Sequence, residues 1–530
     1  MLPNGQLSSW AAYFNSEESN SMKFTGAVAC GHAETSATAV EIMRSGGNAF
    51  DAVIAAVFTA CVAEPMLCSL GGGGFLLARK HEATPRLIDF FTQTPAAQFQ
   101  GEPHFFPIMG NFGKQLQEFH IGLGSMAVPG VLRGLMHVHE RYARIPLAEL
   151  MAPAIRLARN GVKLNAMQAY TLEILKPIVD AGEVCRSIYF NDAEVRKEGD
   201  NIRMPDFADF LGSLAAEGPD LFYMGEPAQR LVDDCRQIGG HLDLQDLLDY
   251  KVIERDPIAW NFAGAKVWSN PPPSSGGLLI AYATRLFETA RAHGDPEQGR
   301  LVQHFIKAQA EANKLRGAEQ LIPEELLSNS NIASVIAGNH SDGFPANRGT
   351  THISIIDGDA NAASLTISNG EGCGYIVPGT GVIMNNMLGE EDLNPDGFGR
   401  WPANERLRSM MAPTIAEHSD GRMLVLGTGG SNRIRSTLFQ ALVRRLYLQQ
   451  DLSDVILSPR IHLEGDLLNI EDFGWPDETR EWMIDQFPQH QLWPEPNLFF
   501  GGVHSVELDP GSGTVSGFGD PRRGGHFQAD

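Results

Sequence analysis

The stretch Gly349-Thr350-Thr351-His352 opens the run Thr351–Asp357 (THISIID), whose β-branched residues predict a strand. If the bond between Gly349 and Thr350 is cut, Thr350 gains a free α-amine beside its own hydroxyl. One residue then carries both a nucleophile and the base that activates it. The glycine before the bond leaves the carbonyl carbon sterically open. An uncut Thr350 would be an ordinary β-branched strand residue, so the four residues alone leave both interpretations open.

The composition is that of a large globular protein. The chain has 530 residues, 43% of them hydrophobic and 20% charged, and length alone favours more than one domain. The formal net charge is −23, and no block of basic residues occurs, which argues against a nucleic-acid partner. No apolar run reaches the ~18–20 residues that a membrane helix needs, so no membrane partner is expected.

The N-terminus lacks a basic start followed by an apolar segment, which argues against a secretory signal. The cysteines form no CxxC pair, which argues against zinc and redox roles. We therefore expect reduced thiols in a cytoplasmic protein, or a periplasmic or secreted one if a leader was removed. No metal ligand cluster and no organic cofactor are expected. The six cysteines are Cys30, Cys61, Cys68, Cys185, Cys235 and Cys373.

Apolar periodicity and glycines place the predicted elements. The middle of the chain, roughly 150–345, is predicted to be mostly helical. From residue 350 onward, short strands with Gly-rich turns and one helix are expected. The four glycines at 71–74 let the backbone pack closely before a strand, and the Lys-Ser/Thr of a phosphate-binding loop is missing. The specific expectations are strands at 26–31, 75–79 and 351–357, and helices at 35–46, 49–62, 301–314 and 436–448.

A series of motifs along nearly the whole chain resembles the γ-glutamyltransferase family, a branch of the N-terminal-nucleophile hydrolases. Each motif is weak alone, but together, and in this order, they are specific. They are Gly46–Ala52 (GGNAFDA), Glu64-Pro65, Gly71–Gly74, Val128–Gly130, Pro271–Gly277, Glu311–Leu315 (EANKL), Thr350–His352, Pro378–Gly381 with Asn385-Asn386, Ala412–Thr414, and Asp520–Gly525 (DPRRGG).

The resemblance implies an α/β fold, a four-layer αββα sandwich. It also implies self-cleavage at Gly349-Thr350 into a large subunit (1–349) and a small subunit (350–530) that stay one folded unit. The implied activity is an amide hydrolase or acyltransferase acting on γ-glutamyl compounds such as glutathione, or on related amides. Its partners would be a small-molecule amide and water or an acceptor amine, without a cofactor. A homo-oligomer is also possible.

Four residues match the family's catalytic positions. Thr350 would be the nucleophile. Gly429 and Gly430 match glycines whose backbone N–H groups form the oxyanion hole. Ser368 stands where the family has a threonine that hydrogen-bonds the nucleophile, so a hydroxyl is kept. His352 is expected to be a packed strand residue rather than a general base.

The residues that would hold the substrate depart from the family pattern. Glu390 matches an acidic residue that binds the α-amino group of a glutamyl substrate, although a solvated acidic loop is an equal alternative. It follows the Asn pair, of which Asn385 is also expected to bind substrate. Phe91 stands where the family has an arginine that clamps the α-carboxylate. The family's paired serines, which also touch that carboxylate, read Ser409 and Met410.

Three functional hypotheses follow from this departure. The first is a γ-glutamyl hydrolase or transferase with a rebuilt pocket. The second is an amidohydrolase for another acyl group, as in relatives that act on oxamate or on glutaryl side chains of cephalosporins. The third is a processed scaffold without catalytic activity.

Overall fold

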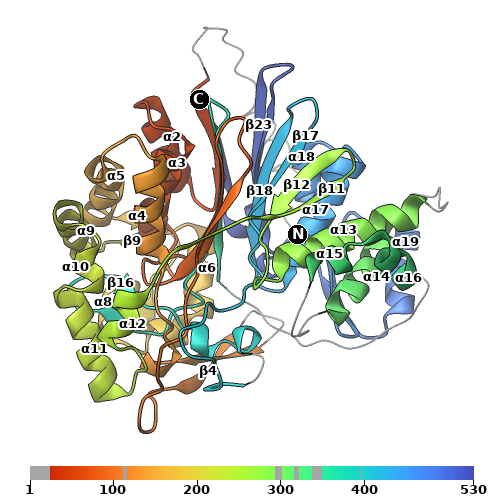
Figure 1. Ribbon diagram of the computed structural model, residues 1–530. Coiled ribbons are helices and arrows are strands. Elements are labelled where there is room, and N and C mark those ends of the chain that lie inside the picture. The colour runs from red at the N-terminus through yellow and green to blue at the C-terminus, as the bar shows by residue number, and fades with distance from the viewer. Residues whose placement is uncertain (1–23, 112–115, 293–300, 316–321, 337–348, 395–396) are drawn as a thin grey trace.

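Two β-sheets stacked face to face form the centre of the molecule, and helices cover both outer faces (Figure 1). The computed structural model describes residues 24–111, 116–292, 301–315, 322–336, 349–394 and 397–530. The four layers confirm the predicted αββα sandwich. Each sheet therefore buries one face against the other sheet and one face against helices.

The first sheet combines strands from both sides of Gly349. All its neighbouring strands run antiparallel. Strands from before and after Gly349 lie next to one another in it, so neither segment forms this sheet alone. The order is β10 (Ile253–Arg255), β3 (Arg86–Phe90), β2 (Gly73–Arg79), β14 (Ala362–Ser368), β13 (Thr351–Asp357), β1 (Gly26–Cys30) and β24 (His526–Ala529).

The second sheet lies against the inner face of the first, with β13 and β14 on β18. Polar side chains on the inner face of β13 and β14 find partners across the gap between the sheets. The Ser354 hydroxyl donates to the His504 carbonyl at 3.0 Å, and the Ser364 hydroxyl donates to the Leu426 carbonyl at 3.1 Å. The order is β11 (Ile258–Phe262), β12 (Ala265–Ser269), β17 (Thr414–His418), β18 (Met423–Gly429), β22 (Gly502–Asp509) and β23 (Thr514–Gly519).

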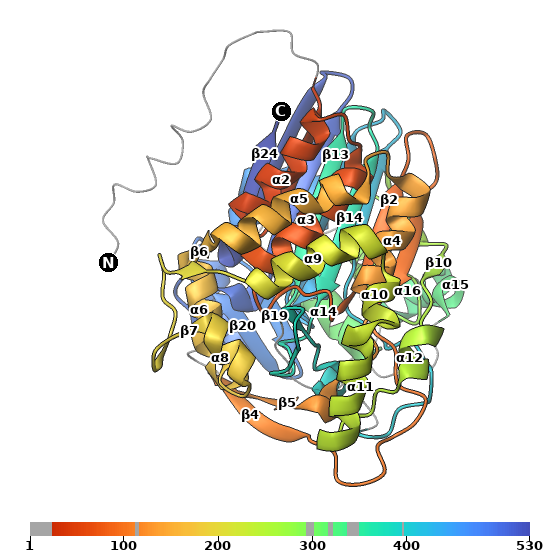
Figure 2. The same cartoon turned by 90° about the vertical axis from the view of Figure 1, so that its left-hand side faces the viewer.

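Helices α2 (Ala33–Arg44) and α3 (Ala49–Ala63) cover the first sheet, and α4, α5 and α9 pack around them (Figure 2). Helix α3 is buried along its entire length. Its start is fixed by a capping box in which Asn48 caps the N-terminus and Asp51 bonds back to the Asn48 N–H. The GGNAFDA motif is therefore a helix stop followed by a helix start.

Helices α13 and α17 cover the second sheet, and α14 packs against α13 and β19. The further helices are α4 (Val131–Tyr142), α5 (Leu147–Asn160), α6 (Ala166–Ile174), α7 (Lys176–Val179), α8 (Glu183–Tyr189), α9 (Pro205–Glu217), α10 (Asp220–Tyr223), α11 (Glu226–Ile238), α12 (Leu244–Asp249), α13 (Gly276–Ala292), α14 (Leu301–Lys314), α15 (Pro323–Leu326), α16 (Asn329–Ile336), α17 (Arg433–Leu442), α18 (Leu452–Leu457) and α19 (Asp477–Gln486).

Small sheets lie outside the sandwich. They are β4 (Phe106–Asn111) with β5 (Leu116–Ile121), β6 (Val162–Lys163) with β9 (Asn201–Ile202), β7 (Phe190–Asn191) with β8 (Glu194–Val195), β15 (Ile376–Val377) with β16 (Val382–Ile383), and β19 (Ile461–Glu464) with β20 (Leu467–Glu471) and β21 (His490–Trp493).

The middle of the chain is mostly helical, as predicted, although β10, β11 and β12 also lie there and join the two large sheets. The expectation of a single helix after residue 350 is wrong. The part after residue 350 has α18 and α19 besides α17. The predicted helix 436–448 begins earlier, at Arg433, and ends in the π-helical turn Val443–Tyr447. Short elements of this kind are set by partners far away in the chain, which local periodicity does not report.

The described residues contain no helix long and apolar enough to cross a membrane. In the same ranges, no group of three or more His, Cys, Asp or Glu residues is placed to hold a metal ion. All six cysteines are buried free thiols. Residues 1–23, which carried the signal-peptide argument, lie outside the described residues.

Candidate active site

Strand pairing places four residues in one row at the end of the first sheet. They are Thr350, Ser368, Gly73 and Phe91. Thr351 pairs with Ile367, so Thr350 lies level with Ser368. Ser368 pairs with Gly73 on β2. Gly73 in turn lies against the backbone of Phe91, since a Cβ on it would come 2.9 Å from the Phe91 Cα. The glycine leaves the space between Ser368 and Phe91 without a side chain.

Two hydroxyl groups point at the carbonyl of Gly349. The Thr350 Oγ1 donates to the Gly349 oxygen at 2.8 Å, and the Ser368 Oγ donates to the same oxygen at 2.6 Å. The two hydroxyl oxygens are 3.4 Å apart. Ser368 also accepts a hydrogen bond from the Gly370 N–H at 3.0 Å, which fixes its orientation. Both hydroxyls are buried, so bulk water does not weaken the polarisation of the Gly349 carbonyl by these two hydrogen bonds.

Charged side chains hold the peptide groups on either side of this bond. The Glu371 Oε1 accepts a hydrogen bond from the Gly349 N–H at 2.8 Å. The Arg523 Nη1 donates to the Thr350 carbonyl at 3.1 Å. Burial lowers the pKa of Arg523 to about 10, and the carboxylates of Asp520 and Glu371 oppose that effect. Arg523 therefore stays a cation at neutral pH, and the Gly349-Thr350 unit is held at both ends.

Gly429 is the last residue of β18 and lies directly against Thr350, and Gly430 follows it. A Cβ on Gly429 would lie 2.2 Å from the Thr350 carbonyl oxygen, so only glycine fits there. Gly430 has a φ of +122°, and the following Ser431 has a φ of +50°, a rare conformation for a residue with a side chain. The Ser431 hydroxyl donates to the Asp392 carboxylate at 3.2 Å. This strained turn lies next to the candidate nucleophile.

The buried carboxyl group of Glu64 lies beside Thr351, the first residue of β13. The Thr351 Oγ1 donates to the Glu64 Oε2 at 2.5 Å, and the Thr35 Oγ1 donates to the other oxygen at 3.1 Å. Burial raises the pKa of Glu64 to about 7, and these two hydrogen bonds oppose the shift. Glu64 thus ties the end of α3 to the residue that follows Thr350.

The structure places Glu390 close to the row and gives Asn385 a backbone-holding role. A Cβ on Gly370 would lie 2.2 Å from the Glu390 Oε1, so Glu390 packs directly against the glycine that precedes Glu371. Asn385 donates from its amide to the Gly71 and Ala127 carbonyls at 2.7 and 2.9 Å and accepts from the Ala127 N–H. Substrate contacts by either residue stay a prediction.

Phe91 is in the core between the sheets. Its side chain is 1% exposed and stacks on Phe75 with ring centroids 5.3 Å apart. Its carbonyl accepts hydrogen bonds from the Tyr250 hydroxyl and the Arg406 guanidinium. Arg406 also pairs with Asp89, its Nε 3.5 Å from a carboxylate oxygen. The guanidinium that bonds to the Phe91 carbonyl is thus engaged within the protein.

Ser409 and Met410 pack against the Asn270–Gly277 turn that precedes α13. The Ser409 carbonyl accepts from the Ser275 N–H at 3.0 Å, and its hydroxyl accepts from the Met411 N–H at 3.1 Å. The Met410 carbonyl lies where a Cβ on Gly276 would be. These contacts position a turn, and a role in binding substrate stays a prediction for both residues.

His352 is fully buried and bonds to Thr366 and Ser354 at 2.8 and 2.9 Å. Burial holds the pKa of His352 well below its usual value. A neutral, enclosed imidazole confirms the expectation of a packed strand residue. Sequence reasoning quoted Glu64 and Arg523 only as parts of motifs and did not single out Glu371. No local signal identifies these three, because each acts on Thr350 or its neighbours from a distant segment.

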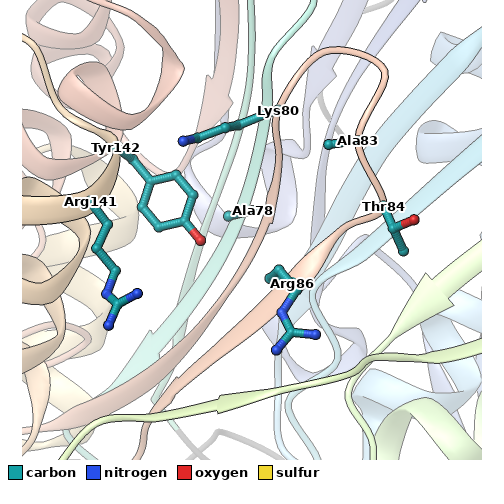
Figure 3. A pocket seen from close by; sticks show the side chains of 7 residues that line it. All are labelled: Ala78, Lys80, Ala83, Thr84, Arg86, Arg141 and Tyr142. Carbon is teal, nitrogen blue, oxygen red and sulfur yellow. The ribbon is translucent and has the colours of Figure 1, made fainter.

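The pocket drawn in Figure 3 is a separate feature. It has a volume of about 300 Å³ and is lined by Lys80, Arg86, Arg141, Tyr142 and three smaller side chains. Lys80 follows the end of β2 that is opposite to Gly73. At ~3.3 Å per strand residue, the pocket is roughly 20 Å from the row that contains Thr350. It is therefore not part of the candidate active site.

Comparisons with known proteins give one consistent likeness. A family model described as Gamma-glutamyltranspeptidase matches residues 35–529. The glutathione hydrolase proenzyme of Escherichia coli (strain K12) is 28% identical over 539 residues, covering 94% of this chain and 90% of that protein. The Acylase ACY 1 proenzyme of Pseudomonas sp. (strain V22) is 27% identical over 530 residues, covering 96% and 94%.

The likeness extends to the fold. Cephalosporin acylase from Bacillus halodurans superimposes with a TM-score of 0.80 at 21% identity, covering 97% of this chain and 98% of that one. The similarity thus runs through both sheets and both helical layers.

Proposed function

Because this chain belongs to the gamma-glutamyltranspeptidase family of N-terminal-nucleophile hydrolases, we propose that it is a proenzyme that cuts itself before Thr350. The product is a large subunit, 1–349, and a small subunit, 350–530, which remain one folded unit because they share the first sheet. The small subunit then hydrolyses or transfers the acyl group of an amide, with Thr350 as nucleophile. The hydroxyls of Thr350 and Ser368 on the Gly349 carbonyl carry this proposal.

The first reaction is an acyl shift within the chain. The Thr350 Oγ1 attacks the Gly349 carbonyl carbon, the C–N bond breaks, and the hydroxyl proton passes to the Thr350 nitrogen. The Ser368 hydroxyl, 2.6 Å from the Gly349 oxygen, stabilises the negative charge that develops there. Water then hydrolyses the resulting ester, leaving a Gly349 carboxylate and a free Thr350 amine. Glu371 and Arg523 hold the two flanking peptide groups during the shift.

The second reaction uses the same hydroxyl on an external amide. The Thr350 amine, with an unperturbed pKa of ~7.7–8.0 for a chain terminus, takes the hydroxyl proton during attack. The leaving amine departs with a proton, and an acyl-enzyme ester remains. Water or an acceptor amine releases the acyl group. We assign the N–H groups of Gly429 and Gly430 to the oxyanion, because this turn adjoins Thr350.

Two acyl groups are candidates for this reaction. The glutathione hydrolase relatives favour γ-glutamyl, with Glu390 on the α-amino group. Phe91 at the position of the carboxylate clamp, together with the acylase relatives, favours another acyl group.

Intact-mass analysis of purified protein tests the cleavage. The wild type should give two fragments, the smaller one beginning with Thr350, while Thr350→Ala should stay a single chain of 57.7 kDa without amidase activity. Thr350→Ser keeps the hydroxyl and should still be cut. Normal cutting of the alanine variant would rule out Thr350 as the nucleophile.

A further inference from the structure

The pocket drawn in Figure 3 is lined by side chains that donate hydrogen bonds. It lies between the turn that joins β2 to β3 and the last turn of helix α4, and its volume is about 300 Å³. Among the described residues, its polar lining consists of Lys80, Thr84, Arg86, Arg141 and Tyr142. Lysine and arginine donate and cannot accept, and the two hydroxyls can donate as well. A ligand rich in acceptor oxygens therefore matches this lining.

Three cations gather at this pocket, in a chain that has 64 acidic and 41 basic residues. Lys80 follows the end of β2, Arg86 starts β3, and Arg141 lies in the last turn of α4. The Lys80 Nζ lies 4.7 Å from the centre of the Tyr142 ring. Burial and the charge of Glu254 raise the pKa of Tyr142, and the nearby guanidiniums of Arg141 and Arg86 oppose this effect. The positive charges of three separate segments thus converge around one phenol.

The backbone on both sides of the pocket is held in place by the fold. The Tyr142 ring packs on Phe50 with ring centroids 4.9 Å apart, and the Asn48 side-chain amide donates to the Tyr142 carbonyl at 2.8 Å. On the other side, the Ala83 N–H donates to the Lys80 carbonyl at 3.0 Å and closes the turn after β2. A ligand therefore has to order only the ends of long side chains, which limits the entropic cost of binding.

Two acidic side chains next to the pocket compete for its cations. Arg86 pairs with Asp256, and the Arg141 Nη1 lies 3.3 Å from the Glu254 Oε1, which His137 also contacts at 2.8 Å. The side chains of Arg86 and Arg141 are 43% and 58% exposed, and that of Asp256 is 88% exposed. Ion pairs between such exposed side chains contribute little free energy, so a doubly charged anion in the pocket can replace them at small cost.

We propose that this pocket binds a small molecule through an oxygen-rich dianionic group, a phosphate or a pair of carboxylates, held by Lys80, Arg86 and Arg141. Each guanidinium presents a planar fork that matches two oxygens of such a group. The volume of about 300 Å³ is at the lower end for ligand pockets, which favours a small ligand. The site lies roughly 20 Å from the row that contains Thr350, so the inference does not depend on the proposed function.

Isothermal titration calorimetry with inorganic phosphate, malonate and acetate tests the ligand class. The titrations use mildly alkaline buffer, in which phosphate is mainly a dianion, at constant ionic strength, because salt screens exposed charges. We expect saturable binding of phosphate or malonate with one site per chain, at least about tenfold tighter than acetate. The tighter of the two dianions identifies the group that the pocket prefers. Absence of saturable binding by both dianions, or equal binding of acetate, overturns the inference.

Variants of the lining residues locate the binding. Lys80→Gln and Arg86→Gln should each weaken the Kd of the bound dianion by about tenfold or more, the usual scale for a hydrogen bond to a charged group. Lys163→Gln, at an exposed position of β6, removes the same charge elsewhere and should leave the Kd nearly unchanged. An unchanged Kd in both pocket variants, or an equal loss in Lys163→Gln, overturns the inference.

The Asp256→Asn variant tests the same site with the opposite sign. It frees Arg86 from its ion pair and should tighten binding of the dianion by about two- to fivefold, the scale of an exposed ion pair. Asp466→Asn, in the exposed turn between β19 and β20, is the matched control and should change the Kd less. An unchanged or weaker affinity of Asp256→Asn would show that Arg86 does not bind the dianion. All these variants should be cut before Thr350 like the wild type, which separates this test from that of the proposed function.

Discussion

Gly429 and Thr350 approach so closely that no side chain fits between them: a Cβ on Gly429 would lie 2.2 Å from the Thr350 carbonyl oxygen and 2.9 Å from its carbon. Both are backbone atoms, so they cannot move aside as the end of a flexible side chain could. The contact fixes the end of β18 relative to the start of β13. It therefore couples the position of the Gly429-Gly430 turn to the position of the candidate nucleophile.

The Gly429→Ala variant should lose activity for this reason. We expect kcat to fall by about 10²- to 10³-fold or more, the scale seen when one oxyanion donor is lost. Steady-state kinetics on any amide that the wild type turns over would measure it. Gly212→Ala, at a helix position with open space around it, should leave kcat unchanged. Full activity of Gly429→Ala would contradict the assignment of this turn.

Ser368 should control the rate of self-cutting. Removing its hydroxyl in Ser368→Ala takes away a 2.6 Å hydrogen bond to the Gly349 carbonyl, and cutting should slow by about 10²- to 10³-fold. Ser368→Thr keeps a hydroxyl and should be cut at a rate closer to the wild type. Gel densitometry during refolding or expression would follow the loss of the uncut chain. Equal rates for all three proteins would remove Ser368 from the mechanism.

Phe91 should resist replacement by arginine. Its ring is 1% exposed and stacked on Phe75, so Phe91→Arg places a charge in the core and should lower the free energy of unfolding by about 3 kcal/mol or more. Phe398→Arg, at a ring that is 36% exposed, is the control and should cost much less. Chemical denaturation would compare them. A stable Phe91→Arg protein with high activity on glutathione would instead show that the pocket can accept the clamp.

Glu64 should make stability depend on pH. Burial raises the pKa of Glu64 from 4.5 to about 7, so the folded state holds its proton more tightly than the unfolded state does. The resulting stabilisation is complete below pH 4.5 and is lost as the pH rises through 7. By linkage the loss is about 3 kcal/mol.

Glu64→Gln, which imitates the protonated carboxyl, isolates this effect. The free energy of unfolding of the wild type minus that of the variant should fall by about 3 kcal/mol between pH 4.5 and pH 8. The difference is used because buried histidines such as His504, whose pKa is lowered to about 4, act in the opposite direction over the same range. A constant difference across these pH values would show that Glu64 does not titrate there.

The residues of the site divide into those that sequence could predict and those it could not. Thr350 belongs to a short motif whose chemistry is visible locally, a hydroxyl directly after a glycine. Gly429 and Ser368 could be singled out only through the resemblance to the family. Glu371 and Arg523 acquire their roles only through the fold, because the Arg523 contact spans 173 residues. The outer helices were predictable where their starts carry caps, as Asn48 does, whereas β10 to β12 depended on partners elsewhere.

The contact between Arg523 and the Thr350 carbonyl also sets an order of events in the cell. A ribosome that has just made Thr350 must still add 173 residues before Arg523 exists. A cut that needs this arginine therefore waits until these 173 residues have been made and the segment that carries Arg523 has folded against Thr350. In the proposed proenzyme, self-cutting then works as an inspection step: a truncated or misassembled chain stays in one piece, and the number of N-terminal threonines counts the molecules that folded correctly.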